Sequence, residues 1–168
     1  MDRGDEPALT RDLLRAWPLP EVEDGGDKHD RGTALVVGGT AATPGAVLLA
    51  GLAALRVGAG RLQLATAGPS AATLGVAVPE AMVVGVPEER LGEVSLDGVD
   101  AVLIGPGLSP GGTAAAALSG LVGRLEGRPL VVDAGALHEL GELPAGRCVL
   151  TPNHGELAAL DPGGLPGP

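Results

Sequence analysis

Short apolar runs alternate with helix-like segments from Thr33 onward. The strand-like runs cover residues 33–37, 61–65, 81–85, 101–104, 129–132 and 148–150, and helical patterns cover about 45–57, 69–75, 112–125 and 135–140, with a last helix after the sixth run. Strands that are apolar throughout and separated by helices are typical of a parallel sheet covered on both faces. The pattern therefore predicts a three-layer αβα domain with a mainly parallel central sheet.

Composition divides the 168 residues into three parts. Residues 1–32 form an acidic arm, in which Thr10 is the expected N-cap of a short helix. Residues 33–160 carry the alternating strands and helices, and residues 161–168 are a tail rich in Gly and Pro. We expect one domain with a substantial core.

Charge and hydropathy exclude several classes of function. Lys and Arg number 11 and Asp and Glu 21, which gives a net charge of −10. Such a surface repels nucleic acid and anionic membranes, so that neither is an expected partner. The apolar stretches are too short to span a bilayer, and the acidic N-terminus does not resemble a signal peptide. A single cysteine, Cys148, is expected to be buried and reduced, and the protein is predicted to be cytoplasmic.

Glycine and polar residues gather directly after four of the predicted strands. The segments are GGTAATPGA after 33–37, GPGLSPGG after 101–104, DAGAL after 129–132 and TPNHGE after 148–150. Ligands of such sheets bind at the carboxyl ends of the strands. We therefore expect the four segments to meet at one edge and to form the functional site.

Two interpretations of the first two segments stay open. Gly39 and Gly45 flank a loop that leads into a helix, whose free N–H groups can bind an anion or a carbonyl, although a tight turn needs glycine for its backbone alone. GPGLSPGG supplies Gly105 and Gly107 of a dinucleotide-binding fingerprint, but Pro110 takes the place of the third glycine.

The last two segments carry the side chains with the most chemistry. Asp133 ends a buried strand, where a carboxylate can hold a metal, a ribose hydroxyl or loop amides, or can cap the helix over 135–140. Asn153 and Glu156 have the spacing of a capping box, with His154 between them. Pairs of Cys, His or Asp with metal-ligand spacing are absent from the sequence, and these residues alone leave the reaction open.

Five blocks taken in order resemble the ADP-dependent NAD(P)H-hydrate dehydratases, which are carbohydrate-kinase-like proteins of the ribokinase-like superfamily. The blocks are KHDRGTALVVGGTAATPGAVLLAGLAALRVGAGRLQLAT, PEAM, DAVLIGPGLSP, PLVVDAGAL and VLTPNHGEL. The resemblance implies a ribokinase-like fold and a repair enzyme whose small-molecule substrates are hydrated NADH and NADPH (NADHX and NADPHX). Such an enzyme eliminates water while ADP is converted to AMP and phosphate, with Mg²⁺ expected.

The resemblance also assigns roles to individual residues. Ala46 would line the hydrated nicotinamide, Gly107 would let the backbone approach the substrate, and Asn153 would form hydrogen bonds where the family often has His. Supporting roles fall on Gly39, Gly45, Gly105, Asp133, His154 and Glu156, and a metal ligand is not among them. Asp133 is the expected functional carboxylate, because Gly135 replaces the second acidic residue of the family's DAD block.

The resemblance reaches only the first part of a family domain. In the family, TP-H/N-GE is followed by further strands, a Lys-Gly stretch and a GTGD block that builds the ADP site and holds the catalytic aspartate, and residues 160–168 do not match them. We therefore expect weak or no activity from the isolated chain, and an exposed sheet edge that favours association into a homo-oligomer. Two alternatives stay open: a non-catalytic nucleotide-binding or scaffold module, and a small-molecule kinase of the same superfamily.

Overall fold

The computed structural model describes residues 10–16, 30–139, 143 and 147–160. Within these residues, six parallel strands form one sheet in the order β3-β2-β1-β4-β5-β6. The strands are β1 (Thr33–Val37), β2 (Arg61–Ala67), β3 (Ala81–Val86), β4 (Ala101–Ile104), β5 (Leu130–Val132) and β6 (Cys148–Leu150). The predicted parallel sheet is confirmed, and each strand agrees with its predicted range to within two residues at either end.

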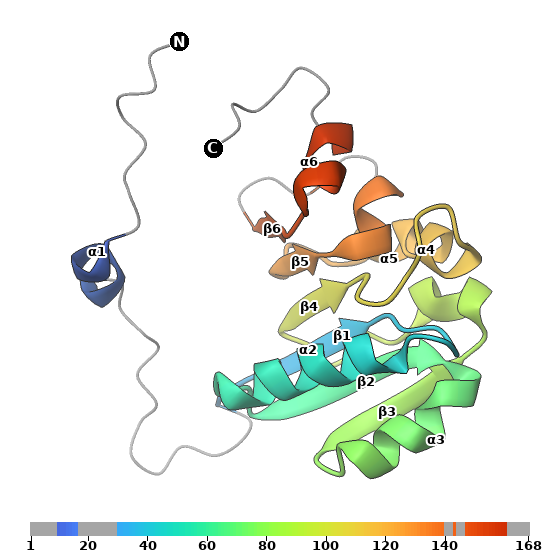
Figure 1. The fold of residues 1–168 in the computed structure, drawn as a ribbon. Coiled ribbons are helices and arrows are strands. Elements are labelled where there is room, and N and C mark those ends of the chain that lie inside the picture. The colour runs from blue at the N-terminus through green and yellow to red at the C-terminus, as the bar shows by residue number, and fades with distance from the viewer. Residues whose placement is uncertain (1–9, 17–29, 140–142, 144–146, 161–168) are drawn as a thin grey trace.

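Helices cover both faces of the sheet (Figure 1). On one face, α2 (Pro44–Arg56) packs against β1 and β2, and α3 (Gly68–Ala77) packs against β2 and β3. The other face is covered by η1 (Glu88–Glu93), α4 (Thr113–Ala117), α5 (Ser119–Val122) and η2 (Ala134–His138). The remaining helices are α1 (Arg11–Ala16) and α6 (His154–Leu160). None of the described helices combines the length and the apolar character needed to cross a bilayer.

Alternation along β1 separates two cores. Leu35 and Val37 belong to the larger cluster, between the sheet and η1, α4, α5 and η2, whereas Val36 belongs to the smaller one under α2 and α3. Successive strand residues point to opposite faces, so one strand serves both clusters. Because the chain contains no Phe or Tyr, both cores are built from small and medium aliphatic side chains.

The segment predicted as one helix over 112–125 is two short helices. The N–H of Leu118 donates to the C=O of Ala115, and the N–H of Leu121 donates to the C=O of Leu118, which are 3₁₀-type bonds that tighten the chain. Ser119 Oγ also donates to the C=O of Ala116 at 3.1 Å, a side-chain bond that competes with a regular helix. The prediction of a continuous helix is therefore wrong at Leu118.

The N-terminal arm is described only in part. The predicted cap at Thr10 is confirmed, because its Oγ1 accepts the N–H of Leu13 at 3.1 Å. Residues 1–9 and 17–29 of the predicted arm and the tail over 161–168 lie outside the described residues.

Strand order reverses between β1 and β4. From β1 the chain moves through β2 to β3 on one side, and it then returns to place β4, β5 and β6 on the other side. In doubly wound sheets, the crevice for a ligand opens at the carboxyl ends of the strands on either side of this switch point. The loops after β1 and β4 are therefore the place where a ligand site is expected.

Candidate functional site at the carboxyl edge of the sheet

The loops after β1 and β4 are bonded to each other at the switch point. The N–H of Gly39 donates to the C=O of Pro106 at 2.8 Å. Thr43 Oγ1 donates to the C=O of Gly107 at 2.5 Å. One backbone bond and one side-chain bond thus hold the two loops together. Thr43 and Gly107 are 64 residues apart in the sequence.

Two of the predicted substrate contacts, Ala46 and Gly107, lie against each other. Gly107 has φ +73, and a Cβ added there would lie 3.0 Å from Cβ of Ala46 and 2.7 Å from the carbonyl oxygen of Thr43. Gly45, next to Ala46, has open space where a side chain would stand. The backbone of the β4 loop therefore lies directly against the first turn of α2, and that turn is open to a ligand at Gly45.

Four hydroxyl groups hold the loop after β1, and the sequence analysis missed all of them. Thr40 Oγ1 and Thr43 Oγ1 lie 2.8 Å apart, and Ser70 Oγ donates to the C=O of Thr40 at 3.1 Å. Thr66 Oγ1 donates to the C=O of Gly39 at 3.3 Å, and both Thr66 and Ser70 are buried. The available signal was a set of small polar residues at the ends of two adjacent strands.

Asp133 links the ends of β5 and β6. Its Oδ1 accepts a hydrogen bond from Thr151 Oγ1 at 2.8 Å. Asp133 precedes η2 but makes no side-chain cap bond to it, since its carboxylate is turned to the hydroxyl of the neighbouring strand end. The capping role considered for Asp133 is therefore wrong. Gly105 has φ +104, and a Cβ there would overlap the carbonyl oxygen of Asp133, so glycine is required where these two loops meet.

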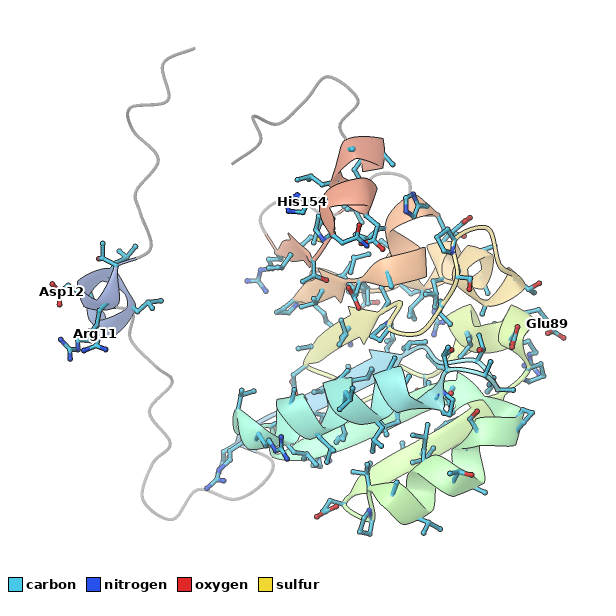
Figure 2. All side chains as sticks on the ribbon, viewed as in Figure 1. Arg11, Asp12, Glu89 and His154 are labelled. Atoms are coloured by element: carbon cyan, nitrogen blue, oxygen red, sulfur yellow. The ribbon has the colours of Figure 1, made fainter. Side chains whose placement is uncertain are left out.

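The predicted capping box at the start of α6 is confirmed. Asn153 Oδ1 accepts the N–H groups of Gly155 at 2.9 Å and Glu156 at 3.0 Å, and Glu156 Oε2 accepts the N–H of Asn153 at 2.8 Å. These bonds use the oxygen of the Asn153 amide, whose NH₂ group can donate to a ligand. Figure 2 shows His154 on the first turn of α6, where it is exposed.

The three predicted contacts share one sheet edge without forming a single cluster. Ala46 and Gly107 adjoin the ends of β1 and β4, whereas Asn153 follows β6. In the strand order β6 lies two places from β4. Neighbouring strands are about 4.8 Å apart, so a ligand that reaches both must span roughly 10 Å.

The same edge carries little charge. Lys and Arg are absent from the four segments GGTAATPGA, GPGLSPGG, DAGAL and TPNHGE, and Asp133 and Glu156 are their only carboxylates. Across the part of the chain that the structure describes, no three His, Cys, Asp or Glu side chains gather in a group that could hold a metal ion. The described residues therefore do not fit Mg²⁺ by themselves.

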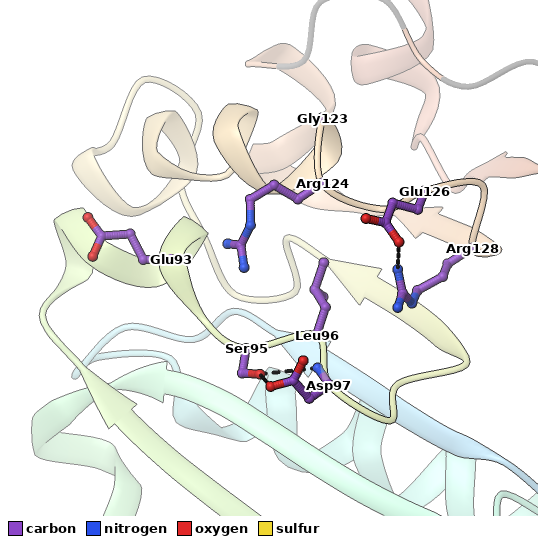
Figure 3. A pocket seen from close by; sticks show the side chains of 8 residues that line it. All are labelled: Glu93, Ser95, Leu96, Asp97, Gly123, Arg124, Glu126 and Arg128. Atoms are coloured by element: carbon purple, nitrogen blue, oxygen red, sulfur yellow. Dashed lines mark hydrogen bonds and ion pairs between the residues drawn. The ribbon is translucent and has the colours of Figure 1, made fainter.

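Two hollows of the described surface lie at the opposite edge, before β4 and β5. One has a volume of about 640 Å³ and is lined by residues of 93–97 and 123–128 (Figure 3), and another of about 350 Å³ lies beside it around Asp100 and Arg147. Arg124 donates to the carbonyls of Gly92 and Val94 at 2.8 and 3.0 Å. The guanidinium thus ties the end of η1 and the start of the linker before β4 to the turn after α5, so Arg124 has a structural role here.

Cys148 is half-buried, although full burial was predicted. β6 is the edge strand of the sheet among the described residues, and the Cys148 side chain is partly covered by its packing against the larger core cluster. Burial raises the pKa of the Cys148 thiol and favours its neutral form.

A six-stranded parallel sheet with its loops meeting at the switch point defines a doubly wound α/β protein, and solved structures narrow that class to the ribokinase-like fold. The chain superimposes on a ribokinase-like superfamily protein of Enterococcus faecalis with a TM-score of 0.77 and 28% identity, over 91% of this chain and 56% of that one. For the ADP/ATP-dependent NAD(P)H-hydrate dehydratase of Bacillus subtilis, co-crystallised with ATP and Mg²⁺, the TM-score is 0.76 and the identity 32%, over 90% and 54%.

Residues 34–163 match the family profile described as NAD(P)H-hydrate dehydratase, and the chain belongs to that family. It is 47% identical over 162 residues to the ADP-dependent (S)-NAD(P)H-hydrate dehydratase of Xanthomonas campestris pv. campestris, covering 90% of this chain and 55% of the relative. It is 39% identical over 164 residues to the bifunctional NAD(P)H-hydrate repair enzyme Nnr of Escherichia coli K12, covering 94% and 31%. The chain therefore spans only part of each relative, and the family resemblance inferred from the sequence is confirmed.

Proposed function

We propose that this chain supplies the substrate-binding half of an ADP-dependent NAD(P)H-hydrate dehydratase. The contact of Ala46 with Gly107 at the switch point carries the proposal, because it joins the two segments to which the family resemblance gives the nicotinamide. Asn153 provides the third contact from the end of β6. The spacing of these groups suits an extended ligand, such as the nicotinamide half of a dinucleotide.

The uncharged loops fit a neutral ring better than a diphosphate. A hydrated dihydronicotinamide ring carries no charge, so its recognition requires shape and hydrogen bonds, which Ala46, Gly107 and the NH₂ group of Asn153 can supply. A diphosphate is usually held by Lys or Arg together with free N–H groups, and the four segments offer the free N–H groups at the start of α2 but neither Lys nor Arg. We therefore assign the hydrate to this edge, and ADP to a part of the family domain outside the described residues.

Dehydration of the ring needs a better leaving group than hydroxide. Transfer of the β-phosphoryl group of ADP to the ring hydroxyl would release AMP and form a phosphate ester, which would leave as phosphate when the ring loses a proton and the double bond forms. The charge of the nucleotide has to be stabilised meanwhile. The described residues fit neither Mg²⁺ nor the diphosphate, so we assign them binding and orientation of the hydrate and leave the catalytic carboxylate outside them.

Asp133 acts as a positioning residue in this proposal. Its carboxylate holds Thr151 Oγ1 at 2.8 Å, and Thr151 is two residues before Asn153. The bond fixes the start of the turn that presents the Asn153 amide, while the capping bonds of Asn153 fix its end.

The proposal is tested with the full 168-residue chain, hydrated NADH or NADPH, ADP and Mg²⁺. We expect calorimetric titration to detect binding of the hydrate, and the near-ultraviolet absorbance of NADH to recover weakly or not at all. Rapid recovery would overturn the assignment of ADP chemistry to another part of the domain, and failure to bind hydrate would overturn the proposed function. Equal affinity for NADPH and its hydrate would favour a nucleotide-binding module, and ATP-dependent phosphorylation of a small alcohol would favour a kinase. A cytoplasmic location and self-association stay predictions.

A further inference from the structure

Thr43 links the two expected hydrate contacts at the switch point, Ala46 and Gly107. Its Oγ1 donates to the C=O of Gly107 at 2.5 Å, and its own C=O accepts the N–H of Ala46 at 3.4 Å. Thr43 is the N-cap residue of α2, where a threonine hydroxyl ordinarily accepts an N–H of its own helix, but it makes no such bond. Because the hydroxyl is used on the loop after β4 instead, the position of Thr43 sets the placement of Gly107 relative to Ala46.

A turn over residues 40–43 fixes Thr43. The N–H of Thr43 donates to the C=O of Thr40 at 3.2 Å, and the N–H of Thr40 donates to Thr43 Oγ1 at 3.3 Å. The two hydroxyl oxygens are 2.8 Å apart, and since the single hydroxyl proton of Thr43 goes to Gly107, Thr40 Oγ1 is the donor between them. The hydroxyls therefore form a chain with one direction, from Thr40 through Thr43 to the C=O of Gly107, in which each bond polarises the next.

Ser70 anchors this turn from the neighbouring helix. It lies in the first turn of α3, is 4% exposed, and donates from Oγ to the C=O of Thr40 at 3.1 Å. That C=O already accepts the N–H of Thr43, so Ser70 is not needed to satisfy it. Alanine is the better helix former and has no hydroxyl to bury, so the helix alone does not explain a serine here.

We propose that Ser70 is a positioning residue of the hydrate site. Its buried hydroxyl holds Thr40 at the start of the turn, and Thr43 at the end of the turn holds Gly107 against Ala46. The inference rests on the proposed function, since it takes the hydrate as the ligand of Ala46 and Gly107. It adds α3 to the elements that determine the affinity for the hydrate, although Ser70 itself acts through Thr40 and Thr43.

The test compares Ser70→Ala with Thr33→Val in the full 168-residue chain. Thr33 is 1% exposed and begins β1, at the opposite end of the strand from the site, where its Oγ1 accepts Nε–H of Arg61 at 2.9 Å. Each variant therefore loses one buried hydroxyl, and both should lower the midpoint of urea unfolding. Ser70→Ala alone should raise the Kd of the hydrate, by about three- to tenfold in calorimetric titrations of the folded variants. An unchanged Kd would overturn the proposal and leave Ser70 a purely structural role.

The double variant Ser70→Ala, Thr43→Val tests the route. If Ser70 acts through Thr43, the double variant should bind the hydrate within about twofold of Thr43→Val alone, because residues of one hydrogen-bond network are not additive. If the two single effects multiply instead, Ser70 does not act through Thr43, and the proposed route is overturned.

A measurement without ligand separates this proposal from the proposed function. In ¹⁵N spectra of the free chain, Ser70→Ala should shift the amides of Ala46 and Leu108, because the former donates to Thr43 and the latter shares a peptide group with the C=O of Gly107. Thr33→Val should leave both amides in place. If the unmodified chain does not bind the hydrate, the proposed function fails, yet shifts at both amides would still support positioning of this contact by Ser70. Unshifted amides would overturn it. Ser70→Cys, which keeps a weaker donor of similar shape, takes the place of Ser70→Ala if the alanine variant does not fold.

Discussion

Replacing Gly107 by Ala tests the central contact of the site. Gly107 has φ +73, a backbone conformation that costs an L-residue about 1–2 kcal/mol. The added Cβ would lie 2.7 Å from the carbonyl oxygen of Thr43 and 3.0 Å from Cβ of Ala46, and forcing a methyl group into packed space costs about 1–3 kcal/mol. Gly107→Ala should therefore lower the free energy of unfolding by about 2–5 kcal/mol, adding the two terms.

Gly111 in the same loop supplies a matched control. It has φ +70, but no atom lies within 4 Å of the position of its Cβ, so Gly111→Ala should lose only the conformational part of about 1–2 kcal/mol. Urea unfolding followed by far-ultraviolet circular dichroism measures both losses. Titration with hydrated NADPH should show weaker binding by Gly107→Ala alone, since the methyl group separates the two loops. Equal loss of stability and equal affinity in the two variants would refute the contact.

Three further predictions concern other residues of the edge. Thr43→Val removes the bond to the C=O of Gly107, and we expect it to lower the free energy of unfolding by about 0.5–1.5 kcal/mol and to weaken hydrate binding. Thr43→Ser keeps the hydroxyl and should retain both stability and binding, so equal behaviour of the two variants would contradict a role for the bond. Asn153→Ala should lower the free energy of unfolding by about 1 kcal/mol through loss of the cap. Asn153→Asp should keep the cap but bind the hydrate weakly, because a carboxylate cannot donate a hydrogen bond. Tight binding of the hydrate by Asn153→Asp would exclude donation from the amide. The raised pKa of Cys148 lowers its thiolate fraction at neutral pH, so iodoacetamide should alkylate this thiol more slowly than free cysteine. The rate of alkylation should rise as the pH passes above the ordinary thiol range. A rate at or above that of free cysteine at neutral pH would contradict the effect of burial.

The sheet could be predicted from the sequence because its strands are short, mostly apolar runs between turn residues, with β2 the least regular because it contains Arg61 and Gln63. Apolar runs indicate strands that are buried on both faces of a sheet, and helical segments between such strands indicate that the strands are parallel. The break at Leu118 could not be predicted in the same way. The break depends on 3₁₀-type bonds and on a single bond from Ser119 to the C=O of Ala116. The pattern of residue types over 112–125 does not reveal either of them.

Site residues were predictable where the pattern is local. Asn153 and Glu156 of the capping box are three residues apart, and this spacing specifies its geometry. Asp133, in contrast, contacts Thr151, which lies 18 residues away directly after β6, and Thr43 contacts the loop after β4 at a separation of 64 residues. Such bonds depend on strand order and register, which sequence patterns alone do not determine.

Mapping the bound hydrate by NMR tests the assignment of the site most directly. A titration of the uniformly ¹⁵N-labelled 168-residue chain with the S-hydrate of NADPH, followed by amide chemical shifts, reports each loop separately. We predict that the largest changes fall on residues 38–46, 105–109 and 151–154, at the carboxyl ends of β1, β4 and β6. Changes confined to the opposite edge, over residues 93–97 and 123–128, or no changes at concentrations that saturate a family relative, would contradict the account.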